Sequence, residues 1–178
     1  MSSRTGCRTE CMSTGANLAS VVMTLLLNKE IAWRFLEAMV RGEMDEMAAL
    51  LHDQGRVFAA GDTTGGGWQT RDEFVTRMTR VGGGAGGLFD GPMTVDIGAV
   101  TAEDDRVCIE MEVRAAVAGG GVYNNQFHWL IRVRDGLVIE AKEYMDTLHA
   151  FDRIPTVDRS NRPRVSNLTE ITGTMSSE

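Results

Sequence analysis

Apolar side chains recur along the chain with two different periods, and the change of period separates helices from strands. A spacing of three to four residues predicts helices at residues 28–40, 45–51 and 70–81. Alternation of apolar and polar residues predicts strands at residues 56–60, 93–100, 106–117, 122–134 and 137–147. Helices followed by a long antiparallel meander indicate an α+β fold with the helices on one face of the sheet.

The 178 residues fit a single domain with a substantial core. We expect a flexible extension over residues 1–22, with Met23 as an alternative start, and a loosely held tail over residues 152–178. The folded domain is therefore expected at residues 23–151. The apolar run at residues 16–27 is too short to span a bilayer, and no small-residue cleavage site follows it.

The phase of the alternation decides which side chains face the helices. In segments 106–117 and 122–134 the odd-numbered positions are mostly apolar or aromatic, whereas many even-numbered positions are charged or polar. Odd positions are therefore predicted to face the helices and even positions the opposite side. A three-residue hairpin turn at residues 134–136 would pair Val133 with Leu137, which keeps odd residues opposite odd residues.

This phase places one carboxylate, that of Glu143, among the inward-facing side chains. Its predicted neighbours are Phe127 across the strand and Asn125 and Trp129 on the diagonals. Burial would raise the pKa of Glu143 into the range of a general acid or base, with Asn125 holding either the carboxylate or a substrate oxygen. The structural alternative is an acid at the mouth of a cup, paired with a helix-borne arginine or lysine.

Charge and cysteine content exclude several classes of protein. The net charge of −7 argues against nucleic acid and anionic membranes as partners. Three cysteines make no disulfide framework, which favours a reducing cytoplasm. No cluster of His, Cys and Asp has metal-ligand spacing, and neither a metal nor a cofactor is expected. Glycines in residues 82–87 match a dinucleotide-binding pattern, but they follow a helix rather than a strand and favour a mobile loop or pocket lid.

Several segments resemble the nuclear transport factor 2-like superfamily, which includes ketosteroid isomerases, limonene epoxide hydrolases and SnoaL-like polyketide cyclases. The similar segments are NKEIAWRFL at residues 28–36, residues 61–74, and the motifs YNNQFH, RDGLVIE and EYMDTLH. The resemblance spans residues 28–151 and implies a cone-shaped, curved antiparallel sheet that cups about three N-terminal helices. A fold shared by many chemistries does not fix the reaction.

The resemblance carries over to catalytic positions only in part. Glu143 falls where the epoxide hydrolases have a catalytic aspartate, but their accompanying Arg-x-Asp pair is not reproduced. Phe35 and Trp129 fall where the isomerases have a tyrosine and a buried acid, and Asp62 lies one position from their general base. The familiar steroid-isomerase mechanism is therefore not expected. Asp62 is a candidate second acid or base, with an exposed loop aspartate as the alternative.

The polyketide cyclases of this superfamily pair a strand histidine with a later acid, which makes His128 a further candidate beside Glu143. The predicted strand phase places these two side chains on opposite faces of the sheet. A bulge near residues 124–125 would bring His128 inside.

These residues predict an enzyme with a cup-shaped apolar pocket and cofactor-free acid/base chemistry on a small hydrophobic substrate, aromatic and polycyclic compounds included. The expected reaction is of the isomerase, dehydratase, cyclase or carbon–carbon lyase type, with Glu143, Asn125, His128 and Asp62 as catalytic candidates. The side chains expected to line the substrate are Phe35, Trp68, Tyr123, Phe127, Trp129 and Met145. The alternatives are a non-catalytic ligand carrier, a protein-interaction module of the same fold, and an epoxide hydrolase-like enzyme. The mixed charges of the outward strand face favour a homodimer through that face.

Overall fold

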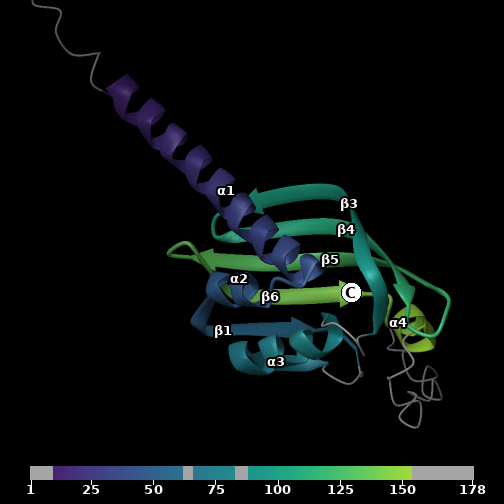
Figure 1. Ribbon diagram of the computed structural model, residues 1–178. Coiled ribbons are helices and arrows are strands. Elements are labelled where there is room, and N and C mark those ends of the chain that lie inside the picture. The colour runs from purple at the N-terminus through teal and green to yellow at the C-terminus, as the bar shows by residue number, and fades with distance from the viewer. Residues whose placement is uncertain (1–9, 62–65, 83–87, 154–178) are drawn as a thin grey trace, which may run out of the picture.

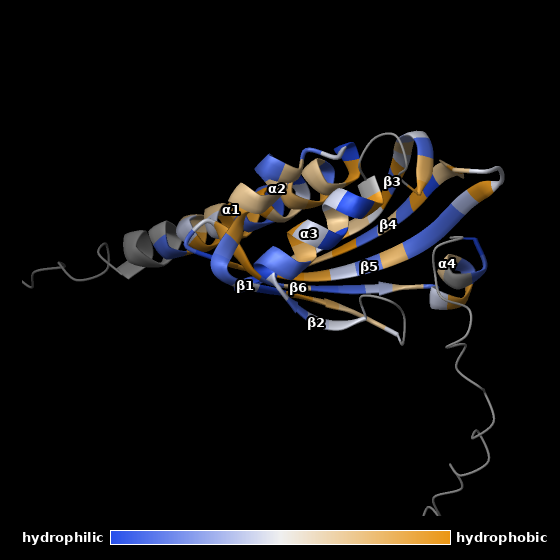
Figure 2. Ribbon diagram, turned by 60° about the horizontal axis from the view of Figure 1, so that its bottom comes forward, coloured by the Kyte–Doolittle hydropathy of each residue, from blue (hydrophilic) through white to orange (hydrophobic). Residues whose placement is uncertain are grey.

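The computed structural model describes residues 10–61, 66–82 and 88–153, which form two layers (Figures 1 and 2). The helical layer contains α1 (Glu10–Arg41), α2 (Met44–Leu50) and α3 (Arg71–Gly82). The second layer is a curved, unclosed sheet of six strands (Figure 1). The strands are β1 (Leu51–Ala59), β2 (Gly67–Thr70), β3 (Phe89–Glu103), β4 (Arg106–Val117), β5 (Val122–Arg134) and β6 (Leu137–Met145). Helix α4 (Thr147–Arg153) follows β6 at one end of the sheet (Figure 1).

The strand order β2-β1-β6-β5-β4-β3 confirms an α+β fold with helices on one sheet face, but the sheet is mixed rather than antiparallel. Strand β1 runs parallel to its neighbour β6, whereas the other neighbouring strands are antiparallel. Strand β2 and helix α4 were not predicted, and α3 lies between β2 and β3 in the chain. The alternation of apolar and polar residues indicates which side chains are buried, but it carries no information on the direction of a neighbouring strand. The parallel pair could therefore not be predicted from it.

Helix α1 begins at Glu10, so residues 10–22 of the predicted extension are helical. This first part of α1 projects away from the sheet (Figure 1). Six large apolar side chains between residues 18 and 27 are 47–66% exposed: Leu18, Val21, Val22, Met23, Leu26 and Leu27. Burial against the sheet begins at the predicted start of the helix, where the side chain of Asn28 donates to the carbonyl of Asp104 at 3.1 Å.

The predicted phase of the long strands is confirmed. On β4 the buried side chains are Val107, Ile109, Met111, Val113, Ala115 and Val117. On β5 the odd-numbered positions from Tyr123 to Val133 are buried or, for Phe127, partly buried, and they face the helices. Phe35 of α1 and Trp129 of β5 are completely buried between the layers. Burying a side chain such as Phe35 contributes about 1.5–3 kcal/mol to folding.

The hairpin between β5 and β6 differs from the prediction, and the difference changes which residues meet. The turn has two residues, Asp135 and Gly136, with φ of 52° and 78°, and it pairs Arg134 with Leu137. Such a turn would place odd residues opposite even ones. A bulge at Ile139, which has no partner on β5, restores the phase.

As a result, Glu143 still faces the helices, but its partner across the strand is not the predicted one. It lies opposite Trp129, and the partner of Phe127 is Met145. Compared with the predicted register, the combination of turn and bulge shifts β6 by two residues along β5. Prediction of the face was therefore correct and prediction of the neighbour was wrong.

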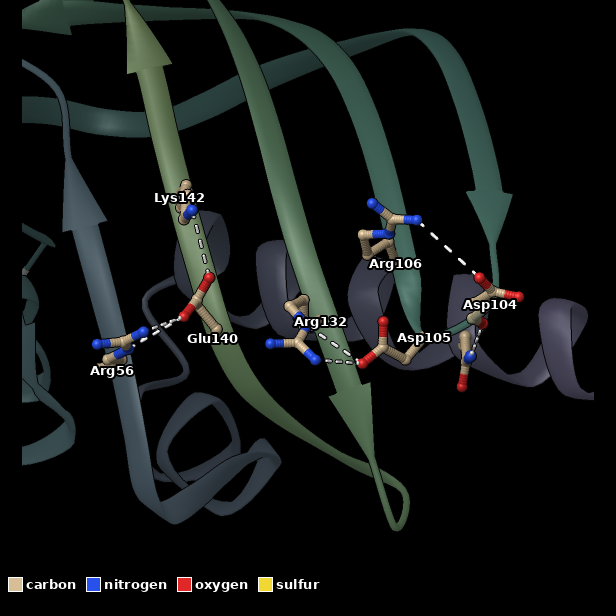
Figure 3. A network of polar contacts seen from close by, with 8 residues as sticks. Arg56, Asp104, Asp105, Arg106, Arg132, Glu140 and Lys142 are labelled. Carbon is tan, nitrogen blue, oxygen red and sulfur yellow. Dashed lines mark hydrogen bonds and ion pairs between the residues drawn. The ribbon is translucent and has the colours of Figure 1, made fainter.

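The outer face of the sheet carries a network of ion pairs (Figure 3). Glu140 of β6 accepts from Arg56 of β1 at 2.7 Å and lies 3.4 Å from Lys142. Arg132 of β5 donates to Asp105 at 2.7 Å. Glu140 is 9% exposed, and its pKa is lowered because Arg56 and Lys142 favour the ionised form against the effect of burial. The charges of this face are thus partly matched within one chain.

Candidate active site

Glu143 lies on β6 in the middle of the sheet, where neighbouring strands fix its backbone on both sides. Trp129 of β5 and Ala59 of β1 are its partners in the two ladders, and its carbonyl accepts from the amide of Ala60 at 2.9 Å. The side chain faces the helices and is only 7% exposed. Within the described residues, no hydrogen bond reaches the carboxylate. A rigid backbone therefore holds a buried acid that is not neutralised by a direct partner.

Burial raises the pKa of Glu143 from 4.5 to about 7, and the nearby positive charge of Arg77 opposes this rise. The protein interior penalises the ionised form because water no longer solvates it. A carboxyl group with a pKa near 7 is present in both forms at neutral pH. It can accept a proton in one step and return it in the next, which is the requirement for general acid/base catalysis.

If Glu143 had a purely structural role, we expected it to pair with an arginine or lysine on a helix. Arg77 of α3 is the arginine in that position. Its Nε donates to Oε1 of Gln69 at 2.9 Å, and its Cζ lies 5.1 Å from the centre of the Phe74 ring. Burial lowers the pKa of Arg77, whereas Glu143 raises it. Although both belong to the described residues, no hydrogen bond or ion pair joins Arg77 to Glu143. The arginine therefore lowers the pKa of Glu143 from a distance and leaves its carboxylate open to another partner.

Helix α3 presents Arg77 to the sheet because its first turn is well fixed. Thr70 and Glu73 form the predicted capping box: the amide of Thr70 donates to Glu73 at 2.8 Å, and the amide of Glu73 donates to Thr70 at 3.4 Å. Arg77 follows the buried Phe74 by three residues, which places both on one face of the helix. The wall beside them is aromatic, since Phe35 lies 6.2 Å from Phe74 and 6.4 Å, edge-on, from Trp129.

Beyond this aromatic wall, two inward-facing side chains next to Glu143 are only partly buried. Phe127 and Met145 are partners across β5 and β6, one inward-facing position along from Trp129 and Glu143. Phe127 packs against the main core and also against a smaller cluster of Val117, Tyr123 and Ala150 at the α4 end of the sheet. The main core and the smaller cluster thus meet beside Glu143, where apolar surface stays partly uncovered.

Tyr123 lies in the smaller cluster and is close enough to Glu143 for the two to interact electrostatically. Burial raises its pKa to about 12, so the hydroxyl keeps its proton at neutral pH. The hydroxyl accepts from Asn125 Nδ2 at 2.9 Å. Tyr123 was predicted to line the substrate, and it does lie on the inward face. Its hydroxyl, however, already takes part in a hydrogen bond within the chain.

The predicted catalytic role of Asn125 does not fit its hydrogen bonds. Its Nδ2 donates both to the Tyr123 hydroxyl and, at 3.0 Å, to the carbonyl of Asp146, while its Oδ1 accepts from the amide of Asp146 at 3.2 Å. Both N–H donors are therefore used within the chain. Asn125 fixes the junction between β6 and α4 rather than a substrate oxygen.

Two further predicted site residues lie on the wrong face of the sheet. His128 is exposed and pairs in register with Glu110 and Tyr144, so no bulge brings it inside. Trp68 is 46% exposed on the outer face, where Arg56 stacks 4.1 Å from its ring centre. Asp62 lies outside the described residues. Of the predicted lining residues, Phe35, Tyr123, Phe127, Trp129 and Met145 share the inner face with Glu143.

Arg77 and Gln69 were missed by sequence reasoning. The signal for Arg77 was its position three residues after Phe74 in a predicted helix, on the edge of the apolar stripe. Gln69 lies in the unpredicted four-residue strand β2 and is 9% exposed. Among the described residues, no group of three or more His, Cys, Asp and Glu side chains is placed to hold a metal ion.

A family model for the SnoaL-like domain matches residues 32–141 of this sequence. The chain belongs to the SnoaL-like family. The match includes α3 with Arg77 and the strand that carries Trp129, and it ends two residues before Glu143. No curated protein matches the sequence.

Several solved structures share this fold. Bal32a, from a soil-derived mobile gene cassette, is 23% identical with a TM-score of 0.61, over 73% of this chain and 97% of that one. A candidate SnoaL-like polyketide cyclase from Jannaschia sp. CCS1 is 17% identical with a TM-score of 0.60, over 74% and 93%. IdmH, a candidate polyketide cyclase from Streptomyces antibioticus, is 17% identical with a TM-score of 0.56, over 71% and 96%. At these identities the likeness shows the fold alone.

No described helix of this SnoaL-like protein combines the length and apolar character needed to cross a membrane.

Proposed function

We propose that this SnoaL-like protein is a small-molecule enzyme in which Glu143 transfers a proton to or from a hydrophobic substrate. The observation that supports this most directly is a carboxyl group that is 7% exposed, has a pKa near 7 and accepts no hydrogen bond from the described residues. A purely structural buried acid is normally paired or hydrogen-bonded, because an unpaired one destabilises the fold. An acid left in this state is poised for a substrate.

The surroundings of Glu143 favour a substrate with an apolar ring system. The partly uncovered Phe127 and Met145 lie beside the acid and offer it an apolar surface, which is backed by the fully buried rings of Phe35, Phe74 and Trp129. Such a surface binds carbon rings and excludes water from the reacting bond. The reaction then begins with proton transfer between Glu143 and the substrate, and it is of the isomerisation, dehydration, cyclisation or carbon–carbon lyase type. Two of the similar structures are described as candidate polyketide cyclases, and cyclisation is one of these reaction types.

Hydrogen–deuterium exchange tests the proton transfer without knowledge of the natural substrate. The α-hydrogens of small cyclic ketones such as 2-tetralone are followed by NMR in deuterated buffer, with and without the protein. Glu143→Gln is expected to slow the catalysed exchange by about 100- to 10,000-fold. His128→Gln, on the outer face, is the matched control and should leave the rate unchanged.

Equal exchange rates for the Glu143→Gln variant and the unaltered protein would refute the assigned role of Glu143. Tight binding of these ketones with no exchange would instead support a ligand carrier, which is the alternative function for this fold.

A further inference from the structure

Two buried N–H donors near Glu143 have no hydrogen-bond partner. They are Nη2 of Arg77 and Nε1 of Trp129. Among the described residues, every other side-chain nitrogen or oxygen atom that is completely buried has a hydrogen-bond partner. Nearly all buried polar groups in proteins are satisfied, because an unsatisfied donor destabilises the fold. That both belong to residues around one buried acid points to a ligand that supplies the missing acceptor.

The placement of both donors follows from contacts already described. Trp129 is the ladder partner of Glu143, and Phe35 contacts its ring edge-on. Arg77 is close enough to Glu143 for each charge to shift the other's pKa. Its Nε is occupied by Gln69, which leaves Nη2 as the free end of an anchored guanidinium. The two donors and the acid therefore belong to one site.

We propose that Arg77 Nη2 and Trp129 Nε1 bind the carbonyl oxygen of the substrate, so that the substrate class is a cyclic ketone or enone. This assignment rests on the proposed proton transfer by Glu143. When the Glu143 carboxylate takes a proton from the carbon next to the carbonyl, the C–H electrons form a carbon–carbon double bond. The carbonyl π electrons then move onto the oxygen, which becomes an enolate. Two N–H donors directed at that oxygen stabilise the charge as it develops.

The charges of the site balance throughout this step. Before proton transfer the site contains ionised Glu143, the Arg77 guanidinium and a neutral ketone. After it, the site contains neutral Glu143, the same guanidinium and an enolate. The negative charge only moves from one neighbour of Arg77 to another, so no net charge appears in the buried site.

Entry of the ligand requires movement, because neighbouring atoms cover both nitrogen atoms in the present arrangement. Arg77 can supply this movement. Its long side chain is held by one hydrogen bond to Gln69 and by the Phe74 ring. A rotation about the outer bonds of Arg77 would uncover its Nη2 without disturbing the sheet.

Binding of 4-nitrophenol tests this inference independently of turnover. Its phenolate resembles a cyclic enolate and has a visible absorbance that the neutral phenol lacks. At a pH below the pKa of the free phenol, the bound molecule is expected to lose its proton to Glu143 and show the phenolate band. Arg77→Met and Trp129→Phe should each weaken phenolate binding by about 10- to 100-fold, the effect of losing one hydrogen bond to a charged oxygen.

The controls are Arg34→Met and Trp68→Phe, which remove the same groups at exposed positions outside the site. Both should bind as the unaltered protein does, and circular dichroism should show that every variant is folded. If Arg77→Met does not fold, Trp129→Phe keeps an aromatic ring at this position and tests the second donor alone. The inference is overturned if no phenol binds, if it binds without the phenolate band, or if removing either donor has no effect. Tighter binding of benzoate than of the phenolate would also overturn it, in favour of a carboxylate ligand. None of these results alters the outcome of the exchange assay on Glu143.

Discussion

Replacing Glu143 with glutamine should stabilise this protein, and by more at high pH than at low pH. Glutamine keeps the shape of the side chain and removes its ability to ionise. In the folded chain the pKa of Glu143 is about 7, compared with 4.5 for an exposed glutamate. A raised folded-state pKa means that folding favours the protonated form. Its contribution to stability is therefore complete below pH 4.5 and is lost as the pH rises through about 7.

The size of the effect follows from the pKa difference. Each pKa unit corresponds to 1.36 kcal/mol, so the carboxyl group of Glu143 lowers the stability of the folded chain, relative to a side chain that cannot ionise, by about 3 kcal/mol at pH 8 and by about 1 kcal/mol at pH 5. The increase in the free energy of unfolding that Glu143→Gln produces should thus be about 2 kcal/mol larger at pH 8 than at pH 5. For a domain of this size, that difference corresponds to about 4–8 °C in melting temperature.

Thermal unfolding followed by circular dichroism at pH 5 and pH 8 measures this difference directly. Effects of the amide itself on packing are present at both pH values and cancel in the comparison. Glu110→Gln, at an exposed position on the outer face, serves as the control and should shift the melting temperature equally at both pH values. An equal shift for Glu143→Gln at the two pH values would refute the reasoning, because it would mean that burial does not raise the pKa of Glu143.

Three other predictions concern neighbouring groups and the outer face. Arg77→Met removes the positive charge that lowers the pKa of Glu143, so the midpoint of the exchange rate against pH should move to higher pH; a midpoint that stays in place would exclude this interaction. Asn125→Ala removes three hydrogen bonds, one buried and two partly buried, and should lower the free energy of unfolding by about 2–4 kcal/mol in denaturant titration, without moving that midpoint. We also propose that two copies pair through the outer sheet face, where Trp68 is 46% exposed; light scattering should give twice the mass of the chain, and Trp68→Asp should halve it.

How much of the site the sequence could predict depends on the kind of information each residue required. The inward direction of Glu143 followed from alternation along the strands, and the structure confirms it. The exposed position of His128 followed from the same phase, against the alternative of a bulge near residues 124–125. Its proposed catalytic role came from the family resemblance instead. Trp68 was assigned to the pocket only because it is aromatic, and it lies on the outer face.

The roles of Asn125 and Arg77 could not have been read from a local pattern. Asn125 is buried as expected, but its amide is used by Tyr123 and by Asp146, which is 21 residues away in the sequence. Arg77 reaches Glu143 from a helix 66 residues earlier in the chain. Each role depends on which groups tertiary packing brings close together.

The sequence by itself determined most of the helices and strands, the capping of α3, the face that each long strand buries and the presence of one acid on that face. These features depend on local periodicity, which the hydrophobic effect imposes on every helix and strand with one buried side. The tertiary structure decided that Trp129 rather than Phe127 lies opposite Glu143, because a two-residue turn and a bulge at Ile139 together set the register. It also decided that the guanidinium of Arg77 comes close to the acid without bonding to it. Register and the approach of separate elements depend on packing between distant parts of the chain, which no local period records.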